Sequence, residues 1–527
     1  MLAIQKRLSN SFYVLLTLPA TAMGFALSVQ IAALSWILST KYGLEIEEIG
    51  LVWAAGPIAG ILGQVIVGVI SDNVWFWGGR RRPFMFIGGV LAALMLLALP
   101  NIDVISTALG IDGILGVAIL VALTLDLAIN VSFNPTRSVI ADVTPEGQER
   151  TKGYTWMQTV SGTFGMLAYL IGTVFDNFAL IYFGAALVLF FSVIPPFFIT
   201  EPRDLNHDGE DDPMDPTAKP DAAVLEDDLE VSASANTKAS AGQVLMTIQP
   251  LWGFLLYGVY GMVKRVLELE FEHYYFEYFC LAVTVFFVAK ALLQRETGKS
   301  KSEAGMIGFQ KVLAAHSFTW VGVQTMFVYM FAYVQDVMPS FGDDEIGDVI
   351  NISFLVLNGV AALLPALILE PVTKRIGRVK THMLCIALMA MGYAGIFFAG
   401  DLLFVFGVQS GISPIVFSEK IPLLLYVLMG IVGIGWAATV SLPFAIMSQK
   451  VDQARMGLYM GLFNLSVVLP QLVASLGIGE IVGAAADKRI IFLICAGTLA
   501  VSAVSWLLVR ENEDAAVADA APAGGGH

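Results

Sequence analysis

The sequence predicts an all-α membrane protein with twelve core transmembrane helices, arranged as two six-helix bundles. First, 57% of its 527 residues are hydrophobic and only 14% are charged, whereas about a quarter of the residues of a soluble domain are charged. Second, long apolar runs occur in two sets of six. Third, a polar segment separates the two sets, and a similar charged loop recurs at the same place in each of them.

Each apolar run approaches or exceeds the roughly 20 residues that a helix needs to cross the hydrocarbon core of a bilayer. The first bundle is expected over residues 1–200, with helices near residues 12–38, 49–70, 84–100, 113–135, 154–174 and 178–199. The second bundle is expected over residues 301–512, with helices near residues 308–334, 347–369, 382–404, 421–447, 456–478 and 489–509.

The segments outside the two bundles are more polar. The chain has a net charge of −15, and the many acids and prolines of residues 201–244 predict a disordered cytoplasmic loop, as does the composition of the tail 513–527. The segment 245–300 contains two further apolar stretches, at 245–263 and 273–293. They form either a membrane-spanning hairpin or two helices at the membrane interface, because a single extra span would invert the second bundle.

The distribution of cations predicts the orientation in the membrane. Cytoplasmic loops are enriched in Lys and Arg, and most of the loop cations fall on the side of the N-terminus. The opposite side carries only Lys41, Lys420, Lys488 and Arg489. We therefore expect a multi-pass protein of the cell (inner) membrane with both termini in the cytoplasm. The first run is expected to span the membrane, since it lacks the cleavage pattern of a signal peptide.

The charged loop that recurs in the two halves combines an acid with several basic residues. Such repetition is typical of transporters built from two related bundles. We expect the charges to pair across the cytoplasmic face and to bias a conformational equilibrium; the alternative is that they only anchor the loops. The residues are Asp72, Arg80, Arg81 and Arg82 in the first half, and Glu370, Lys374, Arg375 and Arg378 in the second.

The fourth run carries an acid inside the membrane. An Asp at the centre of the bilayer costs roughly 2.5–3.5 kcal/mol. On one helix, Asp126, Asn130, Phe133 and Arg137 share a stripe, and Asp126 lies about 16 Å from Arg137 along the axis. The two charges therefore cannot neutralise each other directly. We expect Asp126 to take up and release a proton and Arg137 to anchor or gate a substrate; the alternative is structural ion pairing with other helices.

Four segments carry a resemblance to a known family: residues 79–84, 126–142, 433–445 and 456–471. Together they resemble the sucrose transporter family, in the glycoside–pentoside–hexuronide branch of the major facilitator superfamily, and especially its bacterial members. The resemblance implies a major facilitator fold and proton-coupled import of a disaccharide, such as sucrose, maltose or a related alpha-glucoside, by alternating access. It also implies that Asp126 is the protonatable acid and Arg137 the essential arginine.

A sugar site needs flat faces for stacking and polar groups that match hydroxyls. Polar and aromatic side chains within the runs are therefore candidates for substrate binding, alongside Arg137 and Asn130. Interhelical hydrogen bonding and aromatic packing are the alternative. The other candidates are Gln30, Trp53, Gln64, Gln158, Trp320, Gln324, Asn351, Asn358, Asn464 and Gln471.

Several function classes are not supported by the sequence. Cys280, Cys385 and Cys495 are scattered, which predicts neither a metal site nor a disulfide framework, and basic patches for nucleic acid are lacking. We expect a monomeric transporter rather than an enzyme, with a sugar and membrane lipid as partners and the proton as coupling ion instead of a cofactor. Two alternatives are an exporter of a drug or metabolite with the same fold, and a transport-inactive sugar sensor that signals through residues 201–300.

Overall fold

The structure is a computed structural model. It describes residues 3–61, 75–111, 113–145, 148–202, 241–267, 269, 271–364, 368–399, 422–451 and 456–511. The regular elements in these ranges are helices, and the isolated β-bridge between Phe76 and Gly79 is confined to a loop. Nine helices in the described ranges are long and apolar enough to cross a membrane.

The first half begins with the short α1 (Ala3–Lys6). Its longer helices are α2 (Asn10–Thr40), α3 (Ile46–Trp53), α5 (Arg82–Ala98), α6 (Ile102–Leu109), α7 (Ile114–Val143), α8 (Gln148–Val174) and α9 (Asn177–Phe198). The second predicted run is helical up to residue 61, and its residues 62–70 lie outside the described ranges. The fourth run was expected to end near Pro135, but α7 continues through this proline to Val143. Neighbouring helices tolerate such a proline in a membrane bundle.

The second half starts at residue 301 and is preceded by the inserted segment. The inserted helices are α11 (Ala241–Thr247), α12 (Trp252–Val266) and α13 (Tyr275–Leu293). The helices that follow are α14 (Lys301–Val337), α15 (Asp343–Leu364), α16 (Glu370–Ile376), α17 (Arg378–Phe397), α19 (Leu423–Ser448), α20 (Met456–Val473), α21 (Gly479–Ala484) and α22 (Ile490–Trp506).

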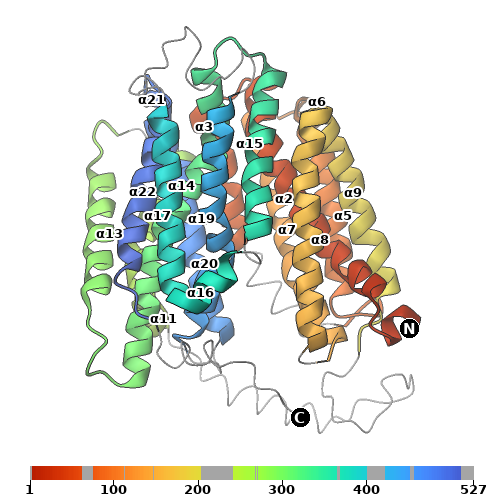
Figure 1. The fold of residues 1–527 in the computed structure, drawn as a ribbon. Coiled ribbons are helices and arrows are strands. Elements are labelled where there is room, and N and C mark those ends of the chain that lie inside the picture. The colour runs from red at the N-terminus through yellow and green to blue at the C-terminus, as the bar shows by residue number, and fades with distance from the viewer. Residues whose placement is uncertain are drawn as a thin grey trace, which may run out of the picture.

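Helix packing follows the same scheme in both halves (Figure 1). In the first half, α2 packs against α8 and α9, while α5 packs against α7 and α9. In the second half, α14 packs against α20 and α22, while α17 packs against α19 and α22. The helices that correspond by sequence order therefore make corresponding contacts, as expected for two related bundles.

The inserted helices α12 and α13 pack against each other and against the second half, where α12 contacts α20 and α13 contacts α14. The last turn of α12 lies beside α21, because Lys264 Nζ donates to Glu480 at 3.0 Å. Within the pair, the Tyr260 hydroxyl donates to Glu277 at 2.8 Å. In Figure 1, α13 runs along the outer flank of the second half. Helices α12 and α13 thus pair with each other, and α13 is apolar and long enough to cross a membrane. That the pair spans the membrane stays a prediction.

The two halves contact each other at the end of the molecule that lies away from the N-terminus. There Asn351 Nδ2 of α15 donates to Asn177 Oδ1 of α9 at 2.9 Å, and the Ser35 hydroxyl of α2 donates to the carbonyl of Val328 at 2.8 Å. Helix α8 also packs along α15. We call these contacts the inter-half seam. Towards the N-terminus the ribbons of the two halves diverge (Figure 1). The structure is therefore closed at the seam end.

A carboxylate closes a loop in each half, and that of Glu201 is buried whereas that of Glu511 is half-buried. Glu201, just after α9, accepts hydrogen bonds from the backbone N–H groups of Arg80, Arg81 and Arg82 at 2.7–2.8 Å. Glu511, after α22, accepts from the N–H groups of Arg378 and Val379 at 2.8 and 3.0 Å. Each carboxylate thus satisfies the free N–H groups at the start of a helix, where negative charge is also favoured by the helix dipole.

Replacing Glu201 with Ala is expected to lower the free energy of unfolding by about 2–3 kcal/mol, because it leaves backbone N–H groups at a buried helix start without an acceptor. Thermal unfolding in detergent measures the effect as a lower Tm. Glu303→Ala is the control, since Glu303 is exposed in the first turn of α14. An equal change in the two variants would contradict this account of Glu201.

Candidate functional site

The carboxylate of Asp126 lies inside the first half, near the middle of α7. Its residue is 5% exposed. Gln30 Nε2 on α2 donates to Asp126 Oδ2 at 3.0 Å, and the helical turn after α3 approaches from a second side at Gly56, where an added Cβ would lie 3.4 Å from the same oxygen. In the described part of the chain, Asp126 forms no ion pair. Its neighbours are therefore a neutral amide and a glycine, which leave a charged carboxylate poorly compensated.

The rest of the predicted stripe on α7 becomes more exposed towards Arg137. Asn130 Nδ2 donates to the carbonyl of Asp126 at 2.8 Å, one turn back along the helix. The guanidinium of Arg137 lies over the ring of Phe133, 4.3 Å from its centroid, and the Arg137 residue is exposed. No ion pair of Arg137 occurs among the described residues. Its charge is stabilised by the aromatic face and stays accessible to a polar ligand.

Helix α8 has an exposed polar face next to α7. Gln158, a predicted candidate, is exposed, and so are Thr155, Thr159 and Thr163. Polar side chains on a membrane-spanning helix normally face the bundle interior or a water-filled cavity rather than lipid. Helix α8 borders the second half through α15, and we interpret this polar face as part of the region between the halves. The three threonines were missed in the sequence, although their spacing of four residues was a readable signal.

Three of the candidates in the second half are held by hydrogen bonds of α14, one of which joins α14 to α20. Gln471 Nε2 donates to Gln324 Oε1 at 3.1 Å. Trp320 donates through Nε1 to His316 Nε2 at 2.9 Å and meets the ring of Trp436 edge-on, at 6.0 Å between centroids. Trp320 and Gln471 are half-buried. These contacts fix an indole ring and an amide pair, the groups that stack on and hydrogen-bond to a polar ring.

Other candidates lie at the inter-half seam or within single helices. Trp53 donates to the Ser35 hydroxyl at 2.8 Å, and Asn351 takes part in the seam itself. Asn358 donates to the carbonyl of Phe354 on its own helix at 2.9 Å, and Asn464 is half-buried on α20. These positions agree with the packing alternative at Trp53 and Asn351. Gln64 lies outside the described residues.

The two charged loops are placed on separate halves. Arg81 Nε forms an ion pair with Asp142 of its own half at 3.0 Å, and both side chains are largely buried. Lys374 and Arg375 are exposed on α16. The predicted partner Asp72 and the side chain of Glu370 lie outside the described structure. Pairing between the two loops stays a prediction.

The long apolar helices of the two halves are those of a multi-pass membrane protein. Consistent with this class, the Major Facilitator Superfamily matches residues 16–474 and 318–525, and the chain belongs to this family. The predicted fold class is thereby confirmed, and so is the expectation that the protein is not an enzyme. The role of each site residue stays a prediction.

Among curated proteins, the chain is similar to the sucrose transport protein SUC4 of Arabidopsis thaliana, with 23% identity over 85% of this chain and 80% of that protein. It is 31% identical to the general alpha-glucoside permease of Schizosaccharomyces pombe, but over only 26% of this chain and 28% of that protein.

Solved structures share the fold. The POT family transporter PepTSo matches with a TM-score of 0.60 and 14% identity, covering 94% of this chain and 96% of its own. The nucleoside transporter NupG matches with a TM-score of 0.54 and 13% identity, covering 95% of this chain and 100% of its own. At these identities the likeness supports the fold alone.

Proposed function

We propose that this protein imports a disaccharide, of the sucrose or alpha-glucoside type, together with a proton. The observation that carries the proposal is the carboxylate of Asp126, which is buried near the middle of α7, a helix long and apolar enough to cross a membrane, against the neutral amide of Gln30. A carboxylate in such a place is stable when protonated and costly when charged. The names of the relatives, a sucrose transport protein and an alpha-glucoside permease, support the choice of substrate.

The proposed cycle links the protonation of Asp126 to closure of the bundles. In the outward-facing state a proton binds the carboxylate and a sugar binds between the halves, beside Arg137 and the polar face of α8. Without a bare charge, the site can be enclosed at lower free energy, and the halves rock about it. The proton then leaves Asp126 towards the cytoplasm, and the sugar is released there.

The orientation predicted from the loop cations indicates which state of this cycle the structure represents. With the N-terminus in the cytoplasm, the inter-half seam lies on the outer side of the membrane. A closed seam then corresponds to the inward-facing state, from which sugar is released. Arg137, exposed near the cytoplasmic end of α7, is positioned to hold the sugar until that step.

Uptake of labelled sugars into proteoliposomes tests the proposal. With an imposed pH gradient, acid outside, we expect concentrative uptake of sucrose or maltose, and no concentrative uptake when an ionophore collapses the gradient. Accumulation of sugar without the gradient would reject proton coupling. Efflux of unrelated hydrophobic compounds in place of sugar uptake would favour an exporter, and sugar binding without any flux would favour a sensor.

A further inference from the structure

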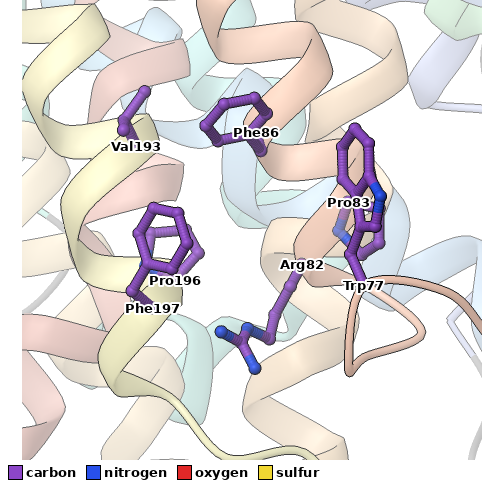
Figure 2. A pocket seen from close by; sticks show the side chains of 7 residues that line it. All are labelled: Trp77, Arg82, Pro83, Phe86, Val193, Pro196 and Phe197. Atoms are coloured by element: carbon purple, nitrogen blue, oxygen red, sulfur yellow. The ribbon is translucent and has the colours of Figure 1, made fainter.

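A cleft lies on the outer flank of the first half, away from the proposed transport site. It is formed between the start of α5 and the end of α9 and has a volume of about 270 Å³. Figure 2 shows the side chain of Arg82 at one end of the cleft, and Phe86 and Val193 at the other. The remaining wall is formed by Trp77, Pro83, Pro196 and Phe197.

The cleft opens to the surroundings of the bundle and not to the space between the halves. Neighbouring side chains on α5 and α9 are apolar and exposed, including Ile87, Phe190 and Ile194. In a membrane-spanning bundle, such a surface is covered by lipid tails. Trp77, which is 67% exposed, stands at the loop end of the cleft, and tryptophan is enriched at the level of the lipid headgroups. The cleft therefore begins at the interface and extends into the hydrocarbon.

Among the described residues, no acidic side chain forms an ion pair with Arg82, whose charge lies at the mouth of the cleft. In the described chain, the guanidinium of Arg82 makes one hydrogen bond, to the carbonyl of Gly78 at 3.2 Å. The nearby Glu201 uses its carboxylate oxygens to cap the backbone N–H groups of residues 80–82, and Asp142 pairs with Arg81. Arg82 thus presents N–H donors to an acceptor outside the protein, and phosphate oxygens match that geometry.

The side chains of the apolar wall pack against one another. Phe86 meets the ring of Trp77 edge-on at 6.0 Å and the ring of Phe197 at 6.2 Å, measured between centroids. Pro83 and Pro196 restrict the backbone on either side. A wall that is ordered before binding loses little entropy when it is occupied. The volume is below the usual 300–1,000 Å³ of a pocket for a drug-sized ligand, and suits one segment of an acyl chain.

We propose that this cleft binds an anionic phospholipid, with its phosphate on Arg82 and the first part of an acyl chain between α5 and α9. The positive charge of Arg82 favours the phosphate of the lipid, and the apolar cleft favours its acyl chain. Basic sites between transmembrane helices on the cytoplasmic side recognise anionic headgroups in this way. The proposal does not depend on which solute is transported.

Quenching by brominated lipids tests the proposal in the full-length protein, with Trp77 as the reporter. The protein is reconstituted in phosphatidylcholine vesicles that contain a minor fraction of dibrominated phosphatidylglycerol or dibrominated phosphatidylcholine. The contribution of Trp77 is the quenching that disappears in Trp77→Phe. We expect this contribution to correspond to an affinity about fivefold higher for the anionic lipid than for the zwitterionic one.

Arg82→Gln is expected to remove the preference. Arg375→Gln is the matched control and should leave the preference unchanged, because it removes an exposed arginine at the same end of the second half. Equal quenching by the two brominated lipids in the wild type would overturn the proposal, as would a preference that survives in Arg82→Gln. The measurement is repeated in inorganic phosphate and in chloride of equal ionic strength. Loss of the lipid preference in phosphate but not in chloride would show that the site binds a free anion, and would also overturn the proposal.

Discussion

Replacing Asp126 with Asn is expected to abolish concentrative uptake while sugar exchange continues. Asn has almost the same shape and can still accept the hydrogen bond from Gln30, so the packing of α2 and α7 is kept. It cannot bind and release a proton. For one proton per sugar, each unit of pH gradient supports about a tenfold accumulation ratio. This ratio should fall to about one in the variant.

Two assays in proteoliposomes separate the expected effects. Uptake driven by a pH gradient measures coupling, and counterflow of labelled against unlabelled sugar measures binding and reorientation. Asp103→Asn is the matched control, because Asp103 is a surface acid paired with Lys41 at 3.4 Å, and such exposed pairs contribute little. Full accumulation in Asp126→Asn would show that the coupling proton is bound elsewhere. Loss of both uptake and counterflow would assign Asp126 to folding or to sugar binding.

The sequence alone located the helices and the buried acid, because both depend on hydrophobicity along the chain. The period of a helix places Asp126, Asn130 and Arg137 on one stripe, and the structure has them on α7 as expected. Helical period does not reveal which neighbouring helix a stripe faces. The sequence therefore predicts Gln30 as a sugar ligand but does not reveal that its amide contacts Asp126.

Contacts between distant segments also could not be predicted from the sequence. Trp53 and Asn351 looked like sugar ligands in the sequence, and they lie in or beside the inter-half seam because the ends of the two halves meet there. Glu201 sits next to a highly acidic stretch and carried no signal of its own. Its function as a cap appears only when the end of α9 is placed beside the start of α5. Such pairings require the tertiary arrangement.

Gly172→Leu is expected to prevent the inter-half seam from closing. Gly172 on α8 lies so close to Asn351 on α15 that an added Cβ would be 2.6–2.7 Å from its side-chain atoms. Asn351 has little freedom to move aside, because it is 1% exposed and donates to Asn177. A leucine there forces the halves apart. Since alternating access requires each end to close in turn, transport should fall by at least about tenfold, on the order of 1.4 kcal/mol or more.

Alkylation of a cysteine placed in the seam separates failed closure from misfolding. The native Cys280, Cys385 and Cys495 are buried and give a low background. Ser35→Cys puts a thiol where the wild-type side chain is 5% exposed. A membrane-impermeant maleimide should label this thiol much faster when Gly172→Leu is also present, provided that the thermal stability of the two proteins is similar.

Gly497→Leu is the control for the size of the new side chain, because an added Cβ at Gly497 meets nothing within 4 Å. It should leave transport and the protection of Ser35→Cys unchanged. If Gly172→Leu transported normally and the thiol stayed protected, the close approach of α8 and α15 would not be required for closure. If the thiol became accessible while transport continued, the seam would not be the barrier that separates the two sides of the membrane. Only blocked transport with an exposed thiol fits a seam that must close in every cycle.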